Sequence, residues 1–288
     1  MLGRAVRAVE DITLDVAAGE VVGIAGPNGA GKSTLIAMLL GFLPPDEGTV
    51  RIDGVTPRAF VEREGIAYLP ELITLPLEWR AIEALARLSA LAGIPTALRA
   101  VECARVIEAV GIAEHADKRL KALSKGNLQR LGLAQALLAD RRVMVFDEPT
   151  HGLDPVWTAR FRDIVGGLRR ADRAILIASH NLDELERLCD RVAIIDRGRL
   201  QRVVSVREAE GALGSVVRRW KVRAATGIEA LAAHLPGAVV AGQTLECTLD
   251  LAALNAGLAV AIAQGALVTA VVPAESSLEE AFRTAVTR

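Results

Sequence analysis

Apolar and polar residues follow two different periods along the chain. Short apolar or alternating runs rich in β-branched residues predict strands, and these runs are residues 21–25, 48–54, 65–70, 143–147, 173–179 and 191–196. Apolar residues at helical spacing predict helices, and these segments are residues 32–42, 155–170 and 181–189. Strands that alternate with helices form a parallel sheet covered on both faces. The pattern therefore predicts an α/β fold with a parallel sheet core.

Residues 76–139 have a different character, because strand signals vanish there and Ala, Leu and Arg recur at helical spacing. Gly and Pro at 93–95, and a second polar and Gly-containing stretch at 121–126, predict breaks between helices. We therefore predict a helical insert, or helical subdomain, over about 76–139.

After Val204 the pattern changes once more. Strands and helices are predicted in alternation, at residues 216–224, 227–235, 238–250, 252–263, 266–272 and 277–286. This order predicts a small α+β appendage and two domains in all, at residues 1–215 and 216–288.

One uncharged segment, residues 251–274, is long enough to span a membrane. It is mostly Ala and Gly and contains Asn255, Gln264 and Pro273. We predict a helix, a turn and a strand here, with a membrane span as the alternative. The first residues hold no apolar run typical of a signal peptide.

Composition narrows the function classes. The 51% hydrophobic content suits a folded core, and 34 Lys and Arg against 35 Asp and Glu give a balanced surface. Nonspecific nucleic-acid binding requires a basic excess, so we expect no nucleic-acid partner. The cysteines are scattered and form no C-x-x-C pair, which argues against a zinc site and favours a reducing compartment.

A phosphate-binding loop follows the first strand and precedes a helix. The segment fits G-x-x-x-x-G-K-[ST] at every fixed position, and the expected nucleotide-binding residues are Gly26, Pro27, Asn28, Gly29, Ala30, Gly31, Lys32, Ser33 and Thr34. Backbone N–H groups and the helix N-terminus attract phosphate. Lys32 is expected to reach the β- and γ-phosphates of ATP, and the Ser33 hydroxyl to bind Mg²⁺. The alternative is a chance match at a Gly-rich turn.

Two carboxylates end the apolar run 143–147. Asp147 stands where a second Mg²⁺ ligand is expected, and Glu148 is the expected general base for the attacking water. A helix cap or a solvated turn is the alternative. His180 ends the next predicted strand, where side chains of an α/β sheet face bound ligands, so we expect it to contact the γ-phosphate. Taken alone, it would be a structural histidine.

Further motifs give the chain a family resemblance. LSKGNLQR (123–130), GLDP (152–155) and the Ser-His pair join the two motifs above in a fixed order. Over about residues 5–215 the chain resembles the ATP-binding-cassette ATPases, the nucleotide-binding subunits of membrane transporters. The resemblance implies a P-loop NTPase cassette and a head-to-tail pair of cassettes. Ser124, Gly126 and Asn127 would then contact ATP on the partner's P-loop, and Asp154 would lie at the seam.

The chain departs from the family pattern at several positions. The usual LSGGQ is LSKGN here, so Lys125 adds a cation and Asn127 shortens an amide. Glu71 replaces the usual Gln and is expected to bind Mg²⁺ or position water. The family's adenine-stacking aromatic is absent before Phe42, so either Val6, Val9 or an arginine would substitute, or the true start of the chain lies upstream of Met1.

The resemblance also implies partners. A single cassette needs a second cassette, which we expect to be an identical copy, and a separate membrane permease, which would hold it at the cytoplasmic face of the membrane. SSLEEAFRTAV (276–286) is similar to the closing segment of export cassettes. A cassette ATPase that acts on the ribosome or nucleic acid is the alternative, disfavoured because no heptads or basic block occur. A small-molecule kinase would leave LSKGN and GLDP unexplained.

Overall fold

The computed structural model describes residues 7–206, 217–274 and 276–286. The chain divides into two compact units, Met1–Val203 and Val204–Arg288. The domain boundary predicted at 215/216 lies outside the described residues.

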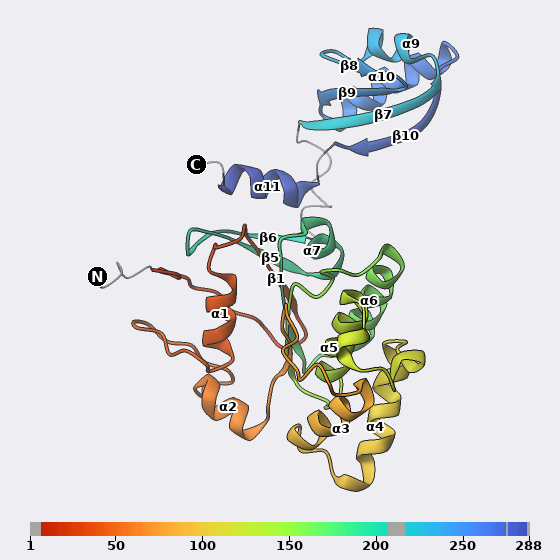
Figure 1. The fold of residues 1–288 in the computed structure, drawn as a ribbon. Coiled ribbons are helices and arrows are strands. Elements are labelled where there is room, and N and C mark those ends of the chain that lie inside the picture. Colours follow the sequence, from red (N-terminus) through yellow and green to blue (C-terminus); the bar gives the residue numbers. More distant parts are fainter. Residues whose placement is uncertain (1–6, 207–216, 275, 287–288) are drawn as a thin grey trace, which may run out of the picture. The chain divides into compact units, whose positions relative to one another are not determined.

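A six-stranded sheet forms the centre of the first unit, in the order β2-β3-β4-β1-β5-β6 (Figure 1). The strands are β1 (Val21–Ala25), β2 (Ala67–Leu69), β3 (Val143–Asp147), β4 (Ala174–Ser179), β5 (Arg191–Asp196) and β6 (Arg199–Ser205). β1 pairs in parallel with β4 and β5, and β3 pairs in parallel with β2 and β4. All five residues of β1 are buried, as expected of a strand covered on both faces.

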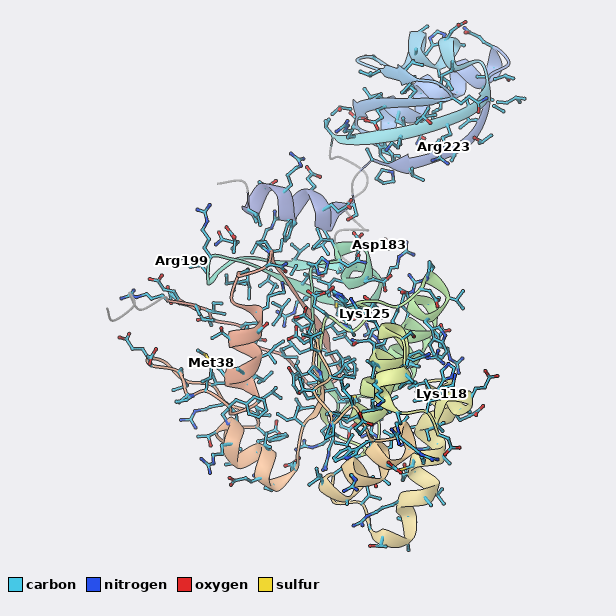
Figure 2. All side chains as sticks on the ribbon, in the orientation of Figure 1. Met38, Lys118, Lys125, Asp183, Arg199 and Arg223 are labelled. Carbon is cyan, nitrogen blue, oxygen red and sulfur yellow. The ribbon has the colours of Figure 1, made fainter. Side chains whose placement is uncertain are left out.

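Helices cover both faces of this sheet, with α1 (Lys32–Leu39) on one side and α6 (Pro155–Leu168) on the other (Figure 1). Side chains fill the space between the layers (Figure 2). Successive residues of a strand point to opposite faces. Val145 accordingly joins the core cluster that contains Ile36 of α1, while Phe146 meets Phe161 of α6 edge to face at 5.9 Å. The predicted parallel sheet core is confirmed.

The remaining helices of this unit are α2 (Pro57–Arg63), α3 (Ala81–Leu91), α4 (Thr96–Ala109), α5 (Lys125–Ala136) and α7 (Leu182–Leu188), with 3-10 turns at Ala113–His115 and Leu120–Ala122. The helical insert therefore exists as predicted, with helix breaks at Gly93 and before Lys125. A further break follows α4, where Gly111 has a φ of +57°.

Two predictions for this unit need correction. Residues 48–54 form no strand, because Ile52 pairs only with Val55 across a tight turn at Asp53 and Gly54 (φ +49° and +77°). β6 was not predicted. It follows β5 after the two left-handed residues Arg197 and Gly198, and a two-residue turn of this kind reverses the chain, so β6 forms the reversed edge of a parallel sheet.

The second unit has its own sheet, in the order β10-β7-β9-β8. Its elements are β7 (Arg218–Thr226), α9 (Ile228–His234), β8 (Val239–Ala241), β9 (Thr244–Leu249), α10 (Leu251–Ala263), β10 (Leu267–Pro273) and α11 (Ser277–Val286). The paired strands are antiparallel. The β-α-β-β-α-β order gives the ferredoxin-like topology. The strand predicted over 238–250 is a hairpin, bent at Gly242 (φ +62°).

The uncharged segment 251–274 contributes α10 and β10 to this unit. Leu254, Leu258 and Ala261 of α10 pack in a core cluster with Trp220 and Val222 of β7. Burial against the sheet accounts for the apolar side chains of the helix. Within the described ranges, no helix is both long enough and apolar enough to cross a membrane.

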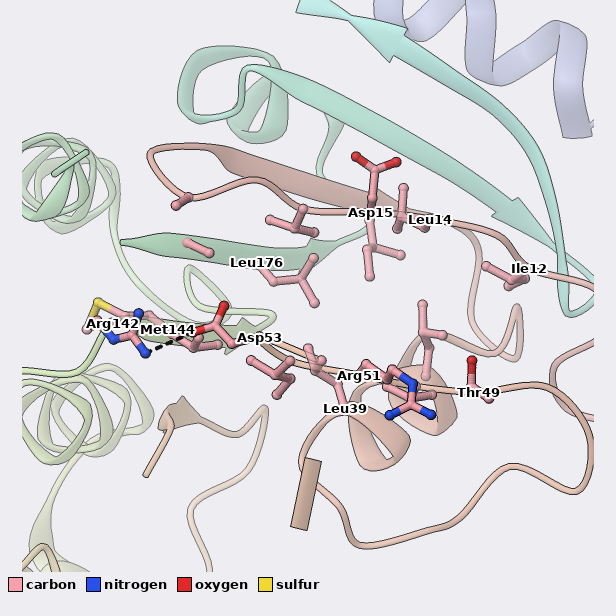
Figure 3. Close-up of a pocket in the computed structure, with 18 of the residues that line it drawn as sticks. Ile12, Leu14, Asp15, Leu39, Thr49, Arg51, Asp53, Arg142, Met144 and Leu176 are labelled. Carbon is pink, nitrogen blue, oxygen red and sulfur yellow. Dashed lines mark hydrogen bonds and ion pairs between the residues drawn. The ribbon is translucent and has the colours of Figure 1, made fainter. Parts of the chain in front are cut away.

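A hollow of about 390 Å³ lies at the amino-terminal ends of β3 and β4 (Figure 3). Its lining includes Val143 and Ala174, the first residues of these strands, with Leu39 of α1. Ligands of open α/β sheets bind at the carboxyl ends of the strands. The position of this hollow therefore argues against a nucleotide site.

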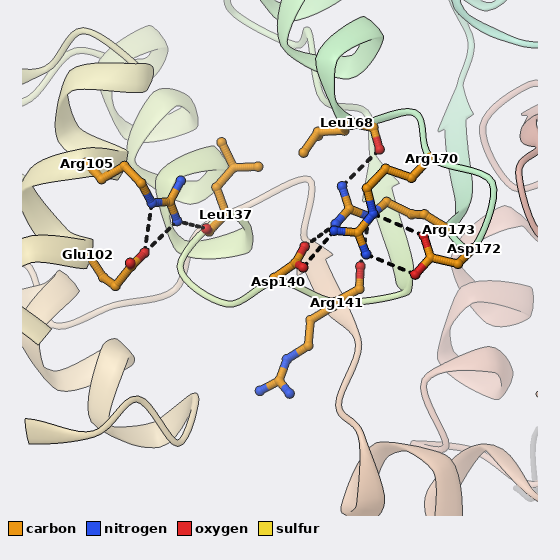
Figure 4. Close-up of polar contacts among 9 residues, drawn as sticks. All are labelled: Glu102, Arg105, Leu137, Asp140, Arg141, Leu168, Arg170, Asp172 and Arg173. Atoms are coloured by element: carbon orange, nitrogen blue, oxygen red, sulfur yellow. Dashed lines mark hydrogen bonds and ion pairs between the residues drawn. The ribbon is translucent and has the colours of Figure 1, made fainter. Parts of the chain in front are cut away.

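Two arginines before β4 bind the segment that follows the helical insert (Figure 4). Arg173 is 4% exposed and donates to Arg141 O and Leu168 O, both at 2.9 Å, and to the carboxylate of Asp140. Arg170 donates to Asp140 as well, at 2.7 Å, but its side chain is 41% exposed. Two neighbouring arginines thus bind the same carboxylate, although one is buried and the other is largely exposed.

We predict that Arg173→Ala lowers the free energy of urea-induced unfolding by about 2–4 kcal/mol, because two carbonyls would lose their partner. Arg170→Ala, as the matched control, should cost much less, since exposed ion pairs contribute little. Equal losses for the two variants would show that burial does not distinguish these arginines.

Candidate functional site

The loop after β1 forms a cradle that only glycine permits at key positions. Gly29 and Gly31 have φ of +81° and +105°, which other residues rarely adopt. A Cβ at Gly26 would lie 2.4 Å from Ile195 O, and one at Gly31 would lie 2.4 Å from Ala8 O. The backbone can therefore approach a bound phosphate closely, as the motif requires.

Lys32 lies along the inside of this loop. Its side chain is buried, and Nζ donates to Gly26 O at 2.6 Å and to Pro27 O at 3.4 Å. Nζ also lies 3.8 Å from Oε1 of Glu148. A buried ammonium that has a carboxylate partner at this distance contributes positive charge to the space enclosed by the loop.

Glu148 is held by several donors. Its φ is +46°, an uncommon value for a residue with a Cβ, and its N–H donates to Ala178 O at 2.8 Å. The carboxylate accepts from Ser179 Oγ at 3.1 Å and from His180 N–H at 3.0 Å. Nδ1 of His180 lies 2.8 Å from Oε2 of Glu148. The chain uses an unusual backbone conformation to fix one carboxylate.

Asp147 is a buried carboxyl with a perturbed charge. Its pKa is raised to about 6, first by burial and then by the negative charges of Glu148 and Glu71, while Lys32 acts in the opposite direction. Perturbed carboxyls of this kind cluster at functional sites. The ionised form of Asp147 is therefore disfavoured until a cation neutralises it.

A cleft of about 470 Å³ brings most predicted site residues together. Its lining includes Lys32 and Ser33 of the loop with Glu71, Asp147 and His180. Gly26, the first residue of the loop, is not part of this lining, and neither are the predicted residues Ser124, Gly126, Asn127 and Asp154. The carboxyl ends of β1, β3 and β4 thus converge on one cleft.

The predicted residues at 124–127 and 154 form a second cluster outside the cleft. Ser124 caps α5 by accepting from Asn127 N–H at 3.2 Å, and Asp154 caps α6 by accepting from Trp157 N–H at 2.9 Å. A Cβ at Gly126 would lie 3.0 Å from Gly152 O, so the two helix starts pack together. We refer to Ser124–Asn127 and Gly152–Asp154 as the signature surface.

One residue that links the two clusters was not predicted from the sequence. Gln129 on α5 is buried and donates to the carbonyls of Glu148 and Pro149, both at 3.2 Å. A polar residue on the buried side of a predicted helix needs hydrogen-bond partners, so the position of Gln129 in the sequence could have indicated such a contact. Ser179 and His151 were also missed, as a donor to Glu148 and as part of the cleft lining.

The expected substitutes for an adenine-stacking aromatic are only partly described. Val6 lies outside the described residues. Val9 lies beside the loop, with Cγ2 3.4 Å from the position of a Cβ at Gly31, and Ala8 lines the cleft. A small apolar surface therefore borders the phosphate-binding loop.

Comparisons with known protein families and curated proteins agree with this geometry. The model of the ABC transporter family matches residues 9–151, and a model described as an AAA domain, putative AbiEii toxin, type IV TA system, matches residues 119–186. DrrA, the daunorubicin/doxorubicin resistance ATP-binding protein of Streptomyces peucetius, is 37% identical over 75% of this chain and 66% of its own length. The methionine import ATP-binding protein MetN of Caulobacter vibrioides is 36% identical over 81% and 72%.

A further relative matches over the same share of its length as DrrA. The uncharacterised ABC transporter ATP-binding protein YhcH of Bacillus subtilis is 34% identical over 69% of this chain and 66% of its own length. The chain thus spans just under two thirds of YhcH and DrrA.

Solved structures share the fold. One described as the ATP-binding subunit of an ABC transporter has a TM-score of 0.64 at 28% identity, covering 71% of this chain and 86% of its own. The dimeric cassette MJ0796 has a TM-score of 0.66 at 21% identity, covering 72% and 94%, and supports the fold alone. With the P-loop cleft and the relatives above, these matches show that the chain belongs to the ABC transporter family, as an ATP-binding cassette.

Proposed function

We propose that the chain hydrolyses ATP as the motor subunit of an ABC transporter and drives a separate membrane permease. The observation that carries the proposal is the convergence of Lys32, Asp147, Glu148 and His180 on one cleft, with the signature surface outside it. The first set suits phosphate binding and hydrolysis. The second set suits contact with the nucleotide of another copy.

Glu148 suits the role of general base. A base must lie within hydrogen-bond reach of the proton it accepts, and Ser179 and His180 already hold this carboxylate in one place. His180 is 60% exposed at its side chain, so its ring can also reach a ligand in the cleft. Lys32 would exchange the carbonyls of Gly26 and Pro27 for phosphate oxygens.

The residues present fit Mg²⁺. Among the described residues no group of three or more His, Cys, Asp or Glu side chains is arranged to hold a metal, and Mg²⁺ beside a nucleotide usually takes few protein ligands. Ser33 and Asp147 would hold it, with Glu71 nearby in the same cleft. The bound ion would neutralise charge on the phosphates.

We predict that Asp147→Asn stabilises the nucleotide-free protein in EDTA above pH 7. The folded-state pKa of Asp147, about 6, lies above the usual 3.8, so ionisation destabilises the wild type as the pH rises through 6. The thermal midpoint of the variant should exceed that of the wild type at pH 8 and equal it near pH 4. The exposed Asp163→Asn is the control. A wild-type advantage at pH 8 would contradict the assignment.

We predict that Glu148→Gln binds ATP as the wild type does but hydrolyses it roughly 10²–10⁴-fold more slowly, because a positioned base contributes that much. Steady-state phosphate release and nucleotide binding measure the two effects. Glu62→Gln, at an exposed carboxylate on α2, should leave both unchanged. Near-normal turnover by Glu148→Gln would exclude Glu148 as the base.

A second cassette completes the proposed site. The signature surface does not line the chain's own cleft, so head-to-tail pairing with another copy would supply it. The start of α5 carries no acidic residue in its first turn, and a helix N-terminus favours anions. Ser124, Gly126 and Asn127 would therefore face the partner's ATP, with Asp154 at the seam.

The permease would dock on the helical insert and on the loop at Glu71, at the cytoplasmic face of the membrane. Leu72 and Leu77 follow Glu71 and are 72% and 55% exposed, which is typical of an interaction surface. Leu75 and Trp79 are half-buried, and Arg87 stacks on Trp79 at 4.6 Å, so these two belong to the insert itself. Export is part of the proposal and rests on the closing helix and the likeness to the resistance protein DrrA.

We predict that Leu72→Glu with Leu77→Glu abolishes co-purification with a multi-span membrane protein. The test uses tagged Glu148→Gln trapped with ATP in gently solubilised membranes. ATP binding should persist, and Phe42→Glu, at a 69% exposed apolar residue after α1, should not affect recovery. Recovery of ribosomes or nucleic acid in place of a membrane protein would overturn the transporter proposal.

A further inference from the structure

Arg130 lies behind the signature surface and is held on several sides. Its Nε donates to Val110 O at 2.8 Å, and a terminal nitrogen donates to Gly111 O. Its other terminal nitrogen, Nη1, donates to Oδ1 of Asn127 at 2.9 Å. The guanidinium therefore joins the end of α4 to the Asn127 side chain on the first turn of α5.

Trp157 fixes the plane of this guanidinium. The Arg130 Cζ lies 3.6 Å from the centre of the Trp157 ring, a distance typical of stacking with a cation–π contribution. A Cβ at Gly111 would lie 2.7 Å from the Trp157 ring, so only glycine leaves room for it. Asp154 accepts from Trp157 N–H, which ties the ring to the start of α6.

The contact with Arg130 determines which end of the Asn127 amide is available. A guanidinium has donors only, so it must face the amide oxygen and never the amide nitrogen. The oxygen is thereby occupied, and the Asn127 NH₂ group is left to donate elsewhere. The Ser124 hydroxyl accepts from the backbone N–H of Asn127, and Lys125 follows Ser124 on the same turn of α5.

We propose that Arg130, backed by Trp157, positions Asn127 as a dedicated hydrogen-bond donor to a phosphate or ribose oxygen of the nucleotide held by a second copy. Arg130 is a positioning residue, because it acts through Asn127. The inference rests on the proposed function, since it requires the head-to-tail pair.

This arrangement compensates for the shorter side chain of Asn127 in the LSKGN motif. Asparagine reaches less far than the glutamine usual in the family, but an amide that is already fixed loses little rotamer freedom on binding. The substituted signature would therefore remain a competent partner for ATP.

The test measures the ATP concentration that half-dimerises the Glu148→Gln parent, by light scattering. Asn127→Asp keeps an acceptor for Arg130 but removes the donor, so the required ATP concentration should rise roughly tenfold or more. Arg130→Met frees the amide, so it should raise the concentration by a smaller factor of about 2–10. The double variant should require the same ATP concentration as Asn127→Asp, because without the amide donor there is nothing for Arg130 to position.

Arg105→Met is the matched control. Arg105 also caps a carbonyl, Leu137 O at 2.8 Å, but does not contact Asn127, so this variant should dimerise like the parent. If Asn127→Asp dimerises like the parent, the inference is wrong. If Arg130→Met lowers the melting temperature without changing the ATP dependence, or if the two effects simply add, Arg130 is only structural. A parent that fails to dimerise with ATP would instead contradict the proposed function.

Discussion

Backbone hydrogen bonds between β3 and β4 set the positions of the reactive side chains. The parallel register places Asp147 opposite Ala178, and the bond from Glu148 N–H to Ala178 O extends the contact past the end of β3. Because the strands are parallel, their carboxyl ends lie together, and Glu148 meets Ser179 and His180 there. A shift of one residue would turn the apolar side chains of β3 to the wrong faces. The core and the site therefore depend on the same register.

The same constraint separates the cleft from the signature surface. The P-loop and the acidic pair follow the strands of the sheet, whereas Ser124 and Asp154 cap helices that pack together elsewhere. Gln129 connects the two regions by donating to the carbonyls of Glu148 and Pro149. These hydrogen bonds physically link α5, which begins at the signature surface, to the backbone at Glu148.

Sequence patterns predicted the elements that depend on local chemistry. The P-loop, the buried strands and the helical insert follow from glycine spacing and apolar periodicity. The prediction of a strand over 48–54 was wrong. A strand needs a neighbouring strand to pair with, and Ile52 pairs only with Val55. The roles of Gln129, Arg130 and Trp157 depend on contacts between segments distant in sequence, such as the stack of Arg130 on Trp157. No pattern in one sequence specifies such contacts.

The departures from the family pattern can also be understood together. Glu71 adds a negative charge to the cleft and raises the pKa of Asp147, which disfavours the ionised form needed for a metal ion. Lys125 adds a positive charge to the signature surface. In the proposed head-to-tail pair, the signature surface of one copy closes over the cleft of the other, so both changes enter one composite site. Their charges are opposite, and electrostatic interactions strengthen as water leaves a closing site. In that proposed pair, the added cation would offset part of the added negative charge.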